Sequence, residues 1–322
     1  MARGLHRKVT AAMVLGMQAP NPDRRLVLCA GLLAPAALLG ACGTPLPLNP
    51  PLGSSAAAAA AQARLMDSAL AHGLEAYRQY QDISVAFTGQ WRPLINGIQP
   101  EVVDRAYRGA SEERLLPSLG AVAQSWRGSD DPRLRKHVFW HRGDAATARP
   151  DELGLWYDGQ ASTDAARAAA SALVAECCGL FLLGPLWLAG RCMPIEVNGT
   201  ERVNGRLCDA VQVWLRPGLG RSPQDRVTVL VDRDDQLTRR LRFTLEGFTG
   251  TSGAVAEVDW LDFSRRFGVL WPTRFYEEVV HPLRLPAHDW ALSGLSVNRG
   301  FSLADLRGPN LSGAAAAPAA PL

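Results

Sequence analysis

Beyond residue 80 the chain mostly alternates apolar and polar positions with a period of two, which is typical of β-strands with one buried face. The alternation is clearest in residues 203–280, where short runs are separated by turns at residues 216–220 and 232–236. Connections this short cannot contain crossover helices, so neighbouring strands must be antiparallel. We predict a β-rich α+β fold in which a meander of roughly nine to eleven strands curls into an incomplete barrel.

Two segments follow a helical period instead. The first predicts one amphipathic helix over residues 62–80, from the spacing of Leu65, Ala69, Leu70, Leu74 and Tyr77. The second begins at Thr163 or Asp164, either of which can cap a helix, and runs to Cys178. It continues into an apolar loop that contains glycine and proline. We expect this insertion, residues 164–190, to lie on the concave face of the sheet.

The insertion either completes the core or covers a ligand cavity. A membrane span is a poorer interpretation, because residues 177–190 number only 14 and are broken by Gly184 and Pro185. If it were exposed, this much apolar surface would need a lipid, an acyl chain or a membrane as its partner. The candidate ligand-binding residues are Leu180, Phe181, Leu182, Leu183, Leu186 and Trp187.

The N-terminus has the three parts of a signal peptide. Arg24 and Arg25 precede an apolar run over residues 26–38, which ends in the small-residue sequence Leu39-Gly40-Ala41-Cys42. The run is about 15 residues long, short of the ~20 that a membrane span requires. The last four residues resemble the lipobox of bacterial lipoproteins. That resemblance implies cleavage before Cys42, a diacylglyceryl group on its thiol, and attachment to a membrane outside the cytoplasm.

The residues after Cys42 suggest where the protein resides and how it is divided. Gly43 stands where an aspartate favours retention in the inner membrane of Gram-negative bacteria, so resemblance to that sorting pattern implies the outer membrane, facing the periplasm. Residues 42–61 are rich in proline, serine and alanine and predict a lipidated tether. We predict a signal peptide over residues 1–41, one half-barrel domain over 62–308, and a disordered tail over 309–322.

Charge gives no reason to expect nucleic acid as a partner. The formal net charge is +3, and most of the basic excess lies in residues 1–41, which leaves 29 basic and 30 acidic residues in the remainder. A cluster of Arg239, Arg240 and Arg242 precedes several carboxylates. We expect cross-strand ion pairs on the solvent face of the sheet, with partners among Glu257, Asp259, Glu277 and Glu278.

Catalytic and metal-binding patterns are absent from the sequence. There is no nucleophile-elbow motif, phosphate-binding loop or paired-histidine zinc motif. His137 and His141 would share a strand face at about 13 Å, too far apart for one metal ion. We therefore expect no enzyme activity, no metal and no cofactor.

Four cysteines follow Cys42, and an oxidising compartment would allow them to pair. Either a bond from Cys192 to Cys208, or one from Cys177 or Cys178 to Cys192, would fix the insertion to the sheet.

The order of elements is similar to a known family: lipobox, tether, helix, antiparallel strands, apolar insertion and further strands. It resembles the LolA/LolB-like superfamily of periplasmic lipoprotein carriers and outer-membrane lipoprotein receptors, over roughly residues 62–305. Stretches 181–185, 239–247, 271–275 and 288–290 look like fixed features of one lipoprotein group. The resemblance implies an incomplete β-barrel closed by helices over a hydrophobic cavity.

Two functions fit this combination, and a third alternative is a hydrolase that acts on envelope material, which turnover of ester or glycan substrates would support. The first is an outer-membrane lipoprotein whose half-barrel binds a lipid or an acyl chain and takes part in lipid or lipoprotein transport. The second is an envelope scaffold or assembly factor that binds a protein partner through its apolar loop.

The proposed lipid attachment has a direct test. Cys42→Ala removes the only acceptor thiol of the lipobox, and each buried methylene of an acyl chain contributes about 0.8 kcal/mol to membrane binding. We expect the variant to move from the membrane to the soluble fraction after cell lysis. Retention in the membrane fraction would show that another feature holds the protein there.

Overall fold

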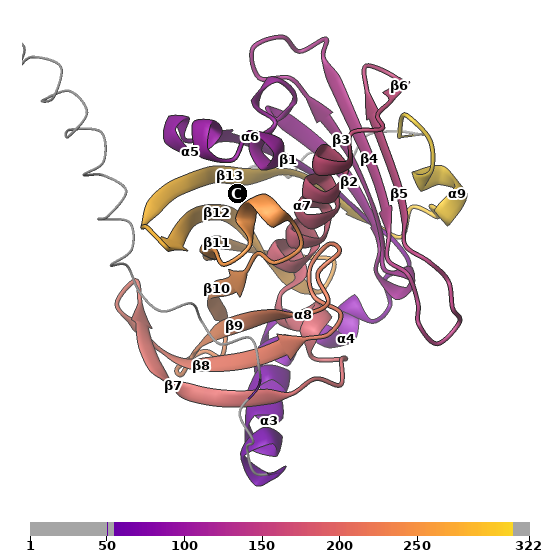
Figure 1. The fold of residues 1–322 in the computed structure, drawn as a ribbon. Coiled ribbons are helices and arrows are strands. Elements are labelled where there is room, and N and C mark those ends of the chain that lie inside the picture. Colours follow the sequence, from indigo (N-terminus) through magenta and orange to yellow (C-terminus); the bar gives the residue numbers. More distant parts are fainter. Residues whose placement is uncertain (1–49, 51–54, 312–322) are drawn as a thin grey trace, which may run out of the picture. The chain divides into compact units, whose positions relative to one another are not determined.

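The computed structural model describes residue 50 and residues 55–311, and these residues form one antiparallel sheet of 13 strands (Figure 1). The strands are β1 Ile83–Trp91, β2 Ala110–Leu116, β3 Ala121–Arg127, β4 Arg135–His141, β5 Glu152–Tyr157, β6 Gln160–Ala161, β7 Ile195–Val203, β8 Arg206–Leu215, β9 Asp225–Asp232, β10 Thr238–Thr244, β11 Val255–Arg266, β12 Val269–His281 and β13 Leu285–Val297. The predicted signal peptide, Cys42, most of the tether and the end of the tail lie outside the described residues.

The helices are short apart from two. They are α3 Ser55–His72, α4 Leu74–Tyr77, α5 Pro93–Ile98, α6 Pro100–Val103, α7 Ala165–Leu183, α8 Pro185–Leu188 and α9 Leu303–Leu306. Short 3-10 turns occupy Arg105–Tyr107, Pro117–Leu119 and Thr249–Thr251.

The strand order is that of two meanders joined side by side. It runs β6-β5-β4-β3-β2-β1-β13-β12-β11-β10-β9-β8-β7, so β1 and β13 pair and neither outer strand has a second neighbour. The sheet therefore stays open, and the predicted incomplete barrel is confirmed. The prediction of nine to eleven strands was too low. Alternation did not reveal β2 and β3, because inward positions on β2 are occupied by Ser111 and Glu113 instead of apolar residues.

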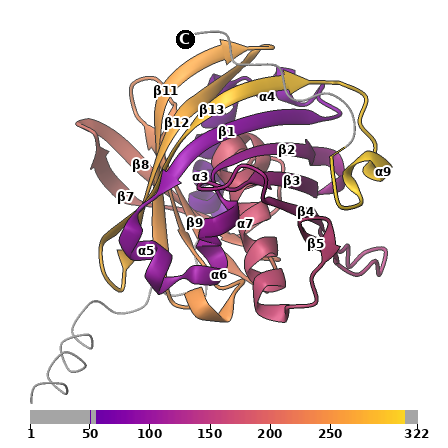
Figure 2. The same ribbon diagram turned by 90° about the horizontal axis from the view of Figure 1, so that it is seen from above.

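The segment that joins the two meanders must cross the sheet. Strand β6 is at one edge and β7 is at the other, and α7 with α8 makes the connection. A helix of 19 residues spans about 28 Å. Figure 2 shows the strands curving around α7, which lies along the concave face as predicted.

Local sequence explains where α7 begins and ends. The Asp164 carboxylate accepts hydrogen bonds from the backbone N–H groups of Ala166 and Arg167, at 2.9 and 3.0 Å, which is an N-cap. The helix continues past the expected end at Cys178 and stops at Gly184, whose φ of 42° suits glycine. Pro185 then opens α8, where its missing N–H costs nothing.

Helix α7 is the main core element of the domain. Its Phe181 ring lies 5.0 Å from that of Phe243 on β10 and 5.7 Å from that of Trp290 on β13, measured between centroids. By length and composition α7 could cross a membrane, but 67% of its most apolar stretch is buried inside the domain. The burial is that expected of a core helix.

The N-terminal helix begins earlier than its apolar spacing predicts. Helix α3 starts at Ser55, inside the segment predicted as tether, so the boundary at residue 62 was wrong. Alanine has the highest helix propensity of all residues, and the run Ala56–Ala61 extends the helix by more than one turn. Ala61 is fully buried, so this added part already packs on the domain.

His72 joins the end of α3 to the sheet. Its Nδ1–H donates to the Leu270 carbonyl at 2.9 Å, and its Nε2 accepts from the Thr238 N–H at 3.1 Å. The ring also packs edge-on against Trp260. Burial lowers the pKa of His72 from 6.5 to about 4, because the neutral imidazole is the form that fits between these partners.

This arrangement predicts a pH-dependent stability. The pKa of His72 is lower in the folded protein than in the unfolded chain. Its contribution to the unfolding free energy is therefore complete above pH 6.5 and is lost as the pH falls toward 4. Between pH 7 and pH 5 we expect the wild type to lose about 2 kcal/mol more unfolding free energy than His72→Gln. Urea unfolding at both pH values measures the difference. Equal losses in the two proteins would exclude His72 as the titrating group.

Candidate ligand site on the concave face

The six predicted ligand-binding residues lie where α7 meets α8. Five of them are buried, with at most 7% of each residue exposed, and Trp187 is half-buried. They face the sheet and do not form an exposed apolar patch. Their part in ligand binding remains a prediction, but two of them, Leu183 and Trp187, line a pocket.

This pocket lies between the α7–α8 corner and the neighbouring ends of β2, β3 and β4. It contains about 50 Å³ of free space. Its apolar wall consists of Leu115, Leu116, Trp140, Leu183 and Trp187. Its ionisable residues are Arg142, Glu176 and Arg191.

Gly179 forms part of the pocket wall. A Cβ atom at this position would lie 3.8 Å from Leu115 Cδ2, which is ordinary van der Waals contact. The missing side chain therefore contributes free space to the pocket, and a Cβ atom can be added there without a clash.

A buried ion pair closes one side of the pocket. Arg142 Nε donates to Glu176 Oε1 at 2.7 Å, and Arg142 also donates to the Gly220 carbonyl at 3.0 Å. The second carboxylate oxygen of Glu176 accepts from the Gly220 N–H at 2.9 Å and from Arg142 Nη2. These bonds attach α7 to β4 and to the loop between β8 and β9. Both oxygens of Glu176 are thereby occupied.

Arg191 follows α8 and covers Trp187. Its guanidinium carbon lies 3.8 Å from the centroid of the Trp187 ring. Burial lowers the pKa of Arg191, whereas the Glu176 carboxylate raises it. The residue alternation did not identify Arg191 or Arg142, because their relation to the pocket depends on the path of α7 across the sheet.

A second polar group occupies the concave face near α5 and α6. Glu277 was expected to form an ion pair on the solvent face, and that prediction was wrong: opposite Val258 and next to His288, it points inward. Only 9% of Glu277 is exposed, and burial raises its pKa to about 7. His288 stacks on Trp91 at 4.2 Å, and Arg108 lies 3.9 Å from the centroid of Trp126.

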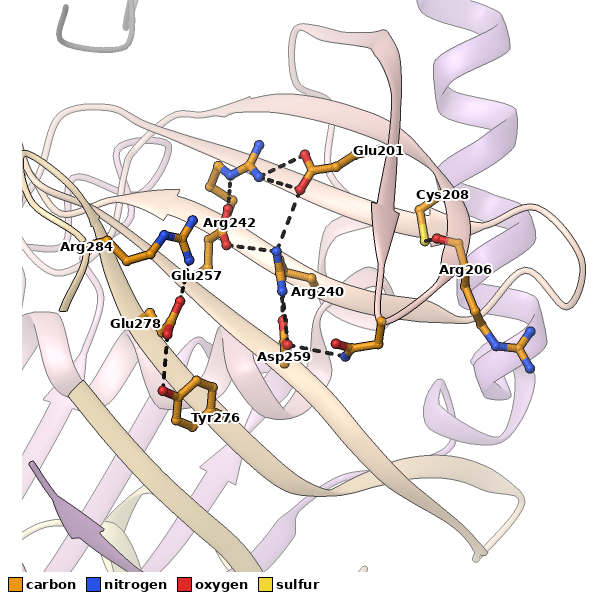
Figure 3. Close-up of polar contacts among 11 residues, drawn as sticks. Glu201, Arg206, Cys208, Arg240, Arg242, Glu257, Asp259, Tyr276, Glu278 and Arg284 are labelled. Atoms are coloured by element: carbon orange, nitrogen blue, oxygen red, sulfur yellow. Dashed lines mark hydrogen bonds and ion pairs between the residues drawn. The ribbon is translucent and has the colours of Figure 1, made fainter. Parts of the chain in front are cut away.

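The predicted cross-strand ion pairs occur on the convex face (Figure 3). Arg240 bonds to Asp259 at 3.0 Å and to Glu257 at 2.9 Å. Arg242 bonds to Glu257 and, at 2.8 Å, to Glu201 on β7, which the sequence did not predict. These contacts join β7, β10 and β11 and stabilise the sheet.

The remaining members of the charged cluster have other partners. Glu278 accepts hydrogen bonds from Tyr276 at 3.1 Å and from Arg284. Arg239 pairs instead with Asp232, at 3.0 Å.

The proposed disulfides do not form in the structure. Cys177, Cys178, Cys192 and Cys208 are all free. Cys208 is paired with Glu201 in the β7–β8 register, and its side chain lies on the convex face, whereas Cys177 and Cys178 belong to α7 on the concave face. Across residues 50 and 55–311, no group of three or more His, Cys, Asp or Glu residues is placed to hold a metal ion.

The chain was compared with known families and structures. No protein-family model matches it, and no curated protein matches its sequence. A DUF1329 family protein from Desulfovibrio piger is similar at 13% identity and a TM-score of 0.46, covering 78% of this chain and 97% of that one. A LolA superfamily protein from Nitrosomonas europaea is similar at 8% identity and a TM-score of 0.42, covering 77% and 97%.

A more distant similarity is to the lipoprotein LppX from Mycobacterium tuberculosis. The identity is 11% and the TM-score 0.25, covering 76% of this chain and 98% of that one. The likeness in all three cases concerns the fold. The open antiparallel sheet with a helix along its concave face is the architecture that the order of elements predicted.

The Arg142–Glu176 pair predicts a large effect on stability. Glu176→Ala leaves the Arg142 guanidinium in a largely buried position without its counter-ion, which typically costs about 3–5 kcal/mol. The control is Glu278→Ala, which breaks a pair whose arginine is mostly exposed, and we expect a loss of about 1 kcal/mol or less. Urea unfolding at pH 7 measures both. Similar small losses in the two variants would contradict a structural role for the buried pair.

Proposed function

We propose that this protein is an outer-membrane lipoprotein, lipidated at Cys42, that binds an acyl chain or a lipid between the α7–α8 corner and the concave sheet. In this role it takes part in lipid or lipoprotein transport across the periplasm. The observation that carries the proposal is the pocket beside Leu183 and Trp187, which has an apolar wall and adjoins the main hydrophobic core.

The size of the pocket requires movement during binding. Pockets for organic ligands usually enclose about 300–1,000 Å³, and this one contains about 50 Å³. An acyl chain would have to displace α8 and the last turn of α7. The break at Gly184 and Pro185 gives α8 a place to pivot, because the two helices share no continuous hydrogen-bond ladder there.

The free energy gained by burying an acyl chain is large enough to offset such a movement. Burying about 400 Å² of acyl surface contributes on the order of 10 kcal/mol before the cost of ordering the chain. The chain would replace contacts that Leu183 and Leu186 now make with the sheet, so the net gain is a fraction of this figure. A moderate and reversible affinity suits a carrier.

The same burial argues against the scaffold alternative. A protein partner that binds through residues 180–187 would need those side chains at the surface, yet five of the six candidates are at most 7% exposed. A hydrophobic ligand can reach them by parting the helix corner from the sheet.

The experiment is to identify what the protein carries. The chain from Gly43 onward is secreted into the periplasm behind an unrelated signal peptide, purified gently, and examined by native and lipid mass spectrometry. We expect a bound lipid in the wild type. We expect less in Gly179→Ala and least in Gly179→Leu, because each added carbon fills pocket space next to Leu115.

A matched control separates filling of the pocket from damage to the fold. Gly97→Leu adds the same side chain in α5, where nothing lies within 4 Å of the new Cβ, and it should keep the wild-type amount of lipid. Gly179→Ala should also be more stable than wild type by about 0.5–1 kcal/mol, because alanine replaces glycine inside a helix. A folded wild type that carries no lipid would refute the proposal.

A further inference from the structure

The side chains that line the pocket offer more hydrogen-bond donors than free acceptors. The only carboxylate in its wall, that of Glu176, already accepts bonds on both oxygens. Two donors have no acceptor within the described part of the chain. One is the indole Nε1–H of Trp140, a residue with 1% of its surface exposed. The other is the guanidinium of Arg191, which packs on the face of Trp187 and makes no side-chain hydrogen bond or ion pair within the described residues.

The side chains that line the pocket also carry more positive than negative charge. Its ionisable residues are two arginines and one glutamate, and the glutamate is committed to Arg142. Among the residues that the structure describes, Arg191 therefore has no direct ion-pair partner, and the Glu176 carboxylate that raises its pKa is shared with Arg142. Arginine stays protonated in proteins and binds carboxylate or phosphate oxygens with two parallel hydrogen bonds.

A buried donor without a partner is uncommon and calls for an explanation. Desolvating the Trp140 N–H without an acceptor costs about 1–3 kcal/mol, which a ligand oxygen would recover. The free space of about 50 Å³ is too small for an acyl chain and adequate for a group of two or three oxygens. Both the shape and the polarity of the pocket therefore suit the polar end of a ligand.

We propose that this pocket binds the anionic end of an amphiphile, a carboxylate or phosphate group that accepts hydrogen bonds from Arg191 and from the Trp140 indole. The adjoining carbons of the ligand lie against Leu115, Leu183 and Trp187. This inference rests on the proposed lipid-binding function and specifies that the head group of the ligand is anionic.

The test compares ligands that share a chain and differ in the head. Equilibrium dialysis of the delipidated protein is carried out with palmitate, hexadecyl phosphate and methyl palmitate. We expect at least one of the two anions to bind at least tenfold more tightly than the uncharged ester, and the tighter of them identifies carboxylate or phosphate as the preferred head.

Substitutions of the pocket residues test whether the preference for an anionic head arises in this pocket. Arg191→Met keeps an unbranched side chain over Trp187 and removes the charge, so anion affinity should fall about tenfold while ester affinity stays within twofold. Trp140→Phe removes the indole donor together with part of the ring, and it should lower anion affinity by a smaller factor while ester affinity falls less. Arg78→Met, at an exposed arginine paired with Glu75, is the control and should leave the affinities for all three ligands unchanged.

The outcomes separate the two proposals. If the ester binds as tightly as the anions and Arg191→Met changes neither, the anionic-head inference fails while lipid binding stands. If none of the three ligands binds the folded wild type, the proposed function fails and the inference fails with it.

Discussion

The path of α7 across the open sheet is the constraint on which the rest of this structure depends. The two meanders end at opposite edges of the sheet, and the chain has one connection with which to join them. A strongly curved sheet with an apolar concave face also needs a cover that excludes water. A long apolar helix meets both needs at once. This explains why residues 164–190 are so much more hydrophobic than an ordinary connection between strands.

The pocket is a consequence of where that cover ends. Helix α7 stops at Gly184, so the chain turns at the corner with α8 before it reaches β7. Gly179 leaves space beside Leu115, and the bonds of Glu176 to Arg142 and Gly220 hold the adjoining loop in place. This free space therefore lies at the corner where α7 gives way to α8. Ligand entry there would disturb α8 first and leave most of the α7 core intact.

The sequence predicted the parts of the fold that depend on periodicity. Alternation in residues 203–280 correctly indicated antiparallel strands, Asp164 correctly indicated the start of a helix, and Arg240 and Arg242 correctly indicated cross-strand ion pairs. It failed where an inward position is polar. The inward-facing Glu113 interrupts the apolar alternation of β2, so that strand was not predicted, and Glu277 was expected on the solvent face although it points inward.

Only part of the candidate site could be predicted from the sequence, because some of its residues are brought together by tertiary packing alone. Leu183 and Trp187 were identified because an apolar run is visible along the chain. Trp140 and Arg142 come from the end of β4, and no spacing relates them to that run. Arg191 directly follows the run, but its sequence position alone did not place it at the site. Only the crossing of the sheet by α7 brings the three together, and that crossing depends on tertiary packing.

The most direct test of ligand binding at this corner is photo-crosslinking with a palmitate analogue that carries a diazirine along its chain. After irradiation of the delipidated protein, the labelled peptides are mapped by mass spectrometry. We expect the labels to concentrate on residues 115–116 and 183–187, and we expect excess unlabelled palmitate to abolish them. Labels confined to the convex face, or labels that unlabelled palmitate does not reduce, would contradict a binding site between α7–α8 and the concave sheet.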